Sequence, residues 1–117
     1  MLKRIAKKLK RFDRKRRIRA ILIGTARRPR LSVFRSLKYI SVQAIDDVSQ
    51  TTLAQANLTE IKNAKHTVKG AEAVGKTMAE RLTKLHIQEI VFDRSGYKYH
   101  GKVKALAEAL RANGITF

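Results

Sequence analysis

The chain has 117 residues, of which 27 are lysine or arginine and nine are aspartate or glutamate, so its net charge is +18. This length predicts one domain and is too short for an enzyme with a second substrate domain. The absence of cysteine excludes disulfides and zinc–thiolate sites. No apolar run approaches the ~20 residues of a transmembrane helix, and none resembles a secretory signal. We therefore expect a soluble, intracellular, basic protein.

The positive charge is concentrated at the N-terminus. Residues 1–35 contain fifteen basic side chains and one acid, Asp13, for a net charge of +14, whereas the other 82 residues carry only +4. We expect so cationic a segment to be poorly ordered until a polyanion neutralises it. The sequence therefore predicts a basic N-terminal extension at 1–27 and a compact domain at 28–117. The domain is expected to begin with extended chain, because Arg28 precedes a proline and such a residue is disfavoured in a helix.

Three strands are predicted at the start of the compact domain. From Arg30 the sequence pattern has a period of two, which is typical of a strand. Leu31, Val33 and Arg35 alternate with Ser32, Phe34 and Ser36. A turn at 37–38 leads to 39–45, which is rich in β-forming residues. Asp and Ser at 46–49 favour another turn, since these side chains hydrogen-bond to their own backbone there. Residues 51–57 are then predicted to form the third strand of an antiparallel meander.

Two helices and one more strand follow. The first helix has an apolar stripe at helical spacing, formed by Ala71, Val74, Gly75, Met78, Leu82 and Leu85. Thr67 is placed to cap its N-terminus, and the short apolar run at 90–92 predicts a buried strand. The second helix has a stripe of Val103, Leu106, Ala107 and Leu110. Gly114 is placed just beyond its end. The order β-β-β-α-β-α predicts an α/β fold whose mixed sheet carries the helices packed on it.

The basic extension is typical of a segment that neutralises nucleic-acid phosphates and releases their counterions. One alternative is a charged face that is simply exposed to solvent. Composition disfavours it, because the segment has a single acid with which its cations could pair. Another is a helix lying on a membrane surface, because Leu and Phe accompany the cations. A membrane helix would not need its positive charge to continue onto the folded domain, as it does at Arg27, Arg28, Arg30 and Arg35.

A second cationic site is predicted in the loop at 93–102. It contains three cations, two phenols and an imidazole, namely Arg94, Tyr97, Lys98, Tyr99, His100 and Lys102. The loop follows a predicted strand and precedes a helix, where α/β sheets tend to place ligands. Aromatic rings stack on unpaired bases while cations bind phosphates, so this mixture favours RNA. The alternative for Tyr97 and Tyr99 is that they cover the edge of the core.

No enzyme is predicted. A metal-dependent nuclease would suit a basic chain, and its converging groups would be Asp46, Asp47, Asp93 and His100. The first two are chain neighbours that point apart in extended chain, and Asp93 is expected to bond to the backbone of its own loop. His66 and His86 lack metal-ligand spacing and are expected at the surface. We therefore predict no catalytic site, no metal and no cofactor.

Several segments resemble one known family. Residues 28–36 read RPRLSVFRS, residues 43–47 read QAIDD, and residues 91–109 read VFDRSGYKYHGKVKALAEA. In this order and spacing the chain resembles bacterial large-subunit ribosomal protein eighteen, the family that binds 5S ribosomal RNA. The resemblance runs from RRIR at 16–19 to the terminal GITF, and YHGKVKALA is its most specific motif.

The chain departs from the family pattern at three places. Leu37 stands where the family commonly has Asn, and Ser41 with Val42 stands where it usually has Tyr–Ala. Ser95 replaces a common Gly, which is expected to make the turn at 93–96 less permissive.

The resemblance implies a structural protein of the cytoplasmic ribosome. Its expected partners are 5S and 23S ribosomal RNA in the central protuberance of the large subunit, and large-subunit ribosomal protein five. It implies no small-molecule substrate and no membrane. In the extension, the RNA-facing cations would be Lys3, Arg4, Lys7, Lys8, Lys10, Arg11, Arg14, Lys15, Arg16, Arg17 and Arg19. The last cation of the extension would be Arg27. In the compact domain the RNA-facing residues would be Arg28, Arg30, Arg35 and Ser36, and then the loop residues Arg94, Tyr97, Lys98, Tyr99, His100 and Lys102.

Overall fold

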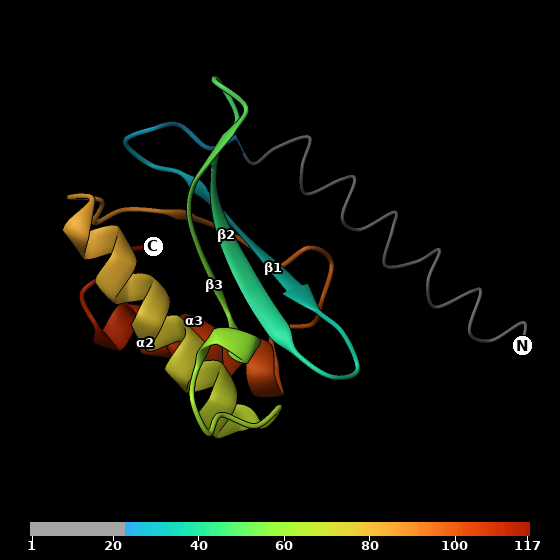
Figure 1. Ribbon diagram of the computed structural model, residues 1–117. Coiled ribbons are helices and arrows are strands. Elements are labelled where there is room, and N and C mark those ends of the chain that lie inside the picture. The colour runs from blue at the N-terminus through green and yellow to red at the C-terminus, as the bar shows by residue number, and fades with distance from the viewer. Residues whose placement is uncertain (1–22) are drawn as a thin grey trace, which may run out of the picture.

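A computed structural model describes residues 23–117 (Figure 1). The elements in chain order are β1 (Arg30–Arg35), β2 (Ile40–Asp46), β3 (Thr51–Asn57), the short 3-10 helix η1 (Leu58–Glu60), α2 (Val68–Lys84), β4 (Val91–Asp93) and α3 (Gly101–Ala112). This order confirms the predicted β-β-β-α-β-α fold. Most of the predicted extension, residues 1–22, lies outside the described residues.

The four strands form one mixed sheet in the order β3-β2-β1-β4. β1 pairs antiparallel with β2, with Val33 opposite Val42, and β2 pairs antiparallel with β3. β4 lies parallel to β1, with Leu31 opposite Phe92. A parallel neighbour needs a long crossover, and α2 provides it. The predicted fourth strand is displaced by one residue, since it spans Val91–Asp93 and not 90–92.

Both helices cover one face of the sheet, and the core lies between them and the strands (Figure 1). Thr67 caps α2 as predicted, because its hydroxyl accepts a hydrogen bond from the Gly70 N–H at 3.2 Å. Gly75 allows α2 and α3 to approach closely: a Cβ there would lie 2.6 Å from the Leu106 carbonyl oxygen. Leu85 is an exception to the predicted apolar stripe. It is 49% exposed because α2 ends at Lys84.

The end of α3 agrees with the prediction for Gly114. This residue has a φ of +95°, and its N–H donates to the carbonyl of Arg111 at 3.2 Å. A left-handed residue directly after a helix favours glycine and satisfies one of the last carbonyls. The chain then returns to the sheet edge, where the Ile90 N–H donates to the Thr116 carbonyl at 3.2 Å.

A buried cluster of charged groups ties three parts of the chain together. Arg30, at the start of β1, is only 7% exposed. Its guanidinium makes two hydrogen bonds of 3.0 Å to the Asp47 carboxylate and one of 2.9 Å to Asp93, which is fully buried. Asp47 also accepts the Gly24 N–H at 2.7 Å and donates its own N–H to the Gly24 carbonyl at 2.9 Å. We call Gly24, Arg30, Asp47 and Asp93 the Arg30 cluster.

The Arg30 cluster includes a residue from the predicted extension. Gly24 lies upstream of the predicted boundary between 27 and 28, yet a Cβ at Gly24 would lie 2.2 Å from the Arg30 nitrogen. The chain is thus packed against the sheet by Gly24 at the latest. The position of the boundary itself stays a prediction.

We predict that Asp93→Asn lowers the free energy of unfolding by about 3 kcal/mol, because removing one partner of a buried ion pair leaves the other charge uncompensated. Urea unfolding of the full chain measures this. The control is Glu108→Gln, which removes the exposed pair with Lys104 at 3.9 Å and should cost less than about 1 kcal/mol. Equal unfolding midpoints for the two variants would show that the Arg30 cluster does not stabilise the fold.

Candidate RNA-binding surface

The loop after β4 is held by hydrogen bonds at its start. The Asp93 carboxylate accepts the Ser95 N–H at 2.8 Å, as expected for an acid that bonds to its own loop. Ser95 and Gly96 both have positive φ, at 56° and 78°, which makes the turn tight. Ser95 tolerates this conformation in a buried position where its hydroxyl lies 3.2 Å from that of Ser32 in β1. The departure from glycine at Ser95 is therefore accommodated by local hydrogen bonds.

Tyr97 joins this loop to the end of β1. Its phenol donates to the Arg35 carbonyl at 2.9 Å and accepts the Arg35 N–H at 3.2 Å. Its ring also packs against the core. Tyr97 thus covers the core edge, which was the structural alternative for this residue. Because of this contact, two cationic segments that are 62 residues apart in sequence become neighbours.

The exposed cations and rings gather around this junction. We define the cationic face as Arg35, Arg94, Lys98, Tyr99, His100 and Lys102. Arg94 and Lys102 are partly buried, and the other four are exposed, Tyr99 by 38%. Within residues 23–117, none of the cations of this face forms an ion pair with an acid. Their charge is available to an external anion.

Other predicted site residues have different positions. Arg27 and Arg28 are exposed in the segment that leads into β1. Ser36 accepts the N–H groups of Lys38 and Tyr39 at 3.2 Å and 3.1 Å, so its hydroxyl closes the turn between β1 and β2. The predicted cations between Lys3 and Arg19 lie outside the described residues.

Arg30 was predicted to face RNA, but its guanidinium is buried in the Arg30 cluster. The hydrogen bonds that Arg30 donates to Asp47 raise the pKa of Arg30, burial lowers it, and the bond that Arg30 donates to Asp93 raises it further. Its positive charge is neutralised inside the protein. We therefore leave Arg30 out of the RNA-facing set and assign it a structural role.

His66 is a neighbour of the cationic face that the sequence did not predict. It lies just before α2 at the surface, as expected, and is partly buried there. Desolvation lowers the pKa of His66, and the positive charges of Lys102 and Arg35 lower it further, while the Ser36 backbone acts in the opposite direction. No sequence signal could have shown this, since a lone histidine in a polar segment carries no spacing pattern.

The acids considered for a nuclease serve the fold. Asp46 accepts the Val48 N–H at 3.0 Å and the Ser49 hydroxyl at 2.8 Å within its turn. Asp47 and Asp93 both bind Arg30. In the described part of the chain, no group of three or more His, Cys, Asp or Glu side chains is arranged to hold a metal ion. None of the helices described is both long and apolar enough to cross a membrane.

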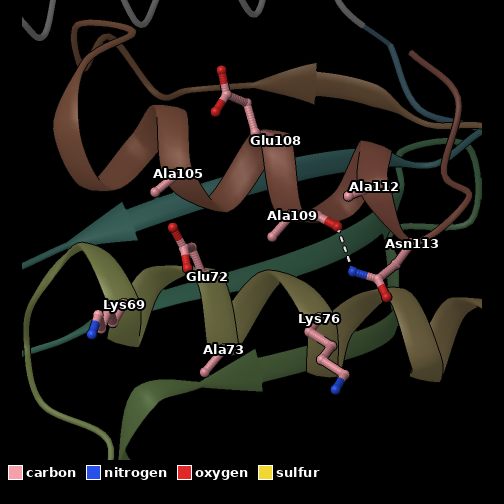
Figure 2. Close-up of a pocket in the computed structure, with 9 residues that line it drawn as sticks. All are labelled: Lys69, Glu72, Ala73, Lys76, Ala105, Glu108, Ala109, Ala112 and Asn113. Atoms are coloured by element: carbon pink, nitrogen blue, oxygen red, sulfur yellow. Dashed lines mark hydrogen bonds between the residues drawn. The ribbon is translucent and has the colours of Figure 1, made fainter.

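A shallow groove of about 480 Å³ runs between α2 and α3 (Figure 2). Alanines from both helices line it, among them Ala73, Ala105 and Ala109. The charged residues at its borders are two lysines and two glutamates, so the groove has no excess of one charge. It lacks the convergent polar groups that orient a small ligand.

Comparison with known proteins identifies the family. Residues 5–117 match the family described as "Ribosomal L18 of archaea, bacteria, mitoch. and chloroplast". The chain is 49% identical to the large ribosomal subunit protein uL18 of Petrotoga mobilis and 48% identical to that of Exiguobacterium sibiricum, in each case over 100% of both chains. It is 52% identical to the uL18 protein of onion yellows phytoplasma over 86% of each chain.

These matches confirm the resemblance found in the sequence. They also agree with the predicted location, which is the ribosome in the bacterial cytoplasm. The chain belongs to the ribosomal L18 family and is a structural, non-enzymatic constituent of the large ribosomal subunit.

Proposed function

We propose that the protein binds 5S ribosomal RNA and helps to attach it to 23S ribosomal RNA in the central protuberance, near large-subunit ribosomal protein five. The observation that carries this proposal is the contact of the Tyr97 phenol with both backbone groups of Arg35. It makes one surface from two cationic segments, and within residues 23–117 none of the cations of that surface forms an ion pair with an acid. The family to which the chain belongs supports RNA as the anion.

The cationic face would bind RNA mainly through phosphates. Arg94 and Lys102 flank the loop, and Tyr97 of the same loop contacts Arg35 at the end of β1, so the three cations can neutralise phosphates of one RNA segment. The exposed ring of Tyr99 offers a stacking surface for an unpaired base. Phosphate contacts fix the position of the RNA, whereas base stacking and the shape of its grooves distinguish this RNA from others.

The remaining cations extend this contact toward a second RNA segment. Arg27 and Arg28 are exposed between Gly24 and Arg30, and the basic residues at 3–19 precede them in the chain. Crowded RNA segments repel one another, and inserted cations offset that repulsion. A body that binds one RNA and a basic extension that reaches another would connect 5S to 23S ribosomal RNA.

Replacing both Arg94 and Lys102 by Gln is expected to weaken binding to 5S ribosomal RNA. If each cation neutralises one phosphate, the slope of log affinity against log salt falls by about 1.4–1.8 in magnitude. Binding measured at several salt concentrations gives this slope. The matched control replaces Lys76 and Lys84, two exposed cations of α2, by Gln. An unchanged slope in the first variant, or an equal decrease in the control, would exclude this role for the loop.

Deleting residues 1–19 is expected to weaken incorporation into the large subunit while the body stays folded. The cut leaves Gly24 and its two hydrogen bonds to Asp47 intact, so the Arg30 cluster keeps all its members. Sedimentation of assembling particles measures incorporation, and circular dichroism measures folding. Loss of the circular dichroism signal at ambient temperature would mean that the extension is part of the folded body.

A further inference from the structure

Three basic side chains from distant parts of the sequence lie near one another in the fold. Arg35 is the last residue of β1, His66 lies in the segment before α2, and Lys102 lies in the first turn of α3. Figure 1 shows α2 and α3 beginning in the lower part of the fold, toward which β1 also runs. Arg35 and Lys102 both lie near enough to His66 to act on its charge.

The His66 side chain has an unsatisfied polar atom. Its Nδ1 is shielded from solvent and has no hydrogen-bond partner among residues 23–117. Every charged group that shifts the titration of His66 is positive, namely Arg35 from β1 and Lys102 from α3. No acid within residues 23–117 pairs with these two cations. This environment disfavours a proton on His66 as long as no anion is present.

We propose that Arg35, His66 and Lys102 form a subsite for one RNA backbone phosphate, and that His66 takes up a proton when this phosphate binds. The proposal rests on the proposed function, because the phosphate belongs to the RNA held by the cationic face. It adds His66 to that face as a residue that strengthens binding through its charge.

The direction of the coupling follows from the electrostatics. In the free protein the pKa of His66 lies below the ordinary value of 6.5, first through desolvation and then through Lys102 and Arg35. A bound phosphate offsets the two positive charges, so the pKa is higher in the complex. Affinity therefore increases as the pH falls through the pKa of the complex and levels off below the pKa of the free protein. Each unit of difference between the two values corresponds to about tenfold in affinity.

The coupling is tested by measuring the dissociation constant of the full chain with 5S ribosomal RNA between about pH 8 and about pH 5.5 at constant salt. The wild-type protein is expected to bind about three- to tenfold more tightly at the lower pH, and His66→Gln to lose most of this change. The control is His86→Gln, which removes an exposed imidazole beyond the end of α2, outside the cationic face, and should keep the change. Calorimetry in two buffers with different ionisation enthalpies should record proton uptake in the wild type and not in His66→Gln.

A second measurement follows the His66 imidazole itself by NMR titration in the free protein. Arg35→Gln removes one of the nearby positive charges and should raise the pKa of His66, whereas Lys84→Gln should leave it unchanged. If the wild type and His66→Gln bind RNA with the same pH dependence, the subsite is overturned while the proposed function stands. A failure of the wild type to bind 5S ribosomal RNA at any pH would overturn the proposed function together with the subsite.

Discussion

Arg30 connects three segments that no local interaction would bring together. It stands at the start of β1, and its guanidinium binds Asp47 after β2 and Asp93 at the end of β4. Burying these charges is tolerable only because each finds a partner with good geometry. The parallel pairing of β4 with β1 and the approach of the chain at Gly24 both depend on the same cluster.

The cationic face is a consequence of that arrangement. Asp93 binds Arg30 with one carboxylate oxygen and the Ser95 N–H with the other, so the loop starts from a fixed position. Tyr97 then fixes the loop to Arg35, and α3 begins a few residues later. Functional side chains placed by hydrogen bonds within the protein keep their spacing before RNA binds, so less ordering is needed on binding.

Features that depend on short-range patterns could be predicted from the sequence. The strands and helices, the Thr67 cap and Gly114 follow from periodicity and from chemistry within a few residues. The partners of Arg30 lie 17 and 63 residues away, and an arginine in a basic chain looks like one more RNA contact. The position of His66 beside Lys102 was also beyond prediction, because it depends on how α2 and α3 pack.

The two hydrogen bonds between Gly24 and Asp47 also determine how the extension can contribute to affinity. They anchor the chain on the body next to Arg30, at the start of β1, so the residues before Gly24 leave the body from a defined point. Once the body has bound, any contact that those residues make with RNA is an intramolecular step, governed by effective concentration rather than by bulk concentration. Even individually weak contacts of the extension would then multiply the affinity of the body, and lengthening the chain between the anchor and these cations would reduce the gain.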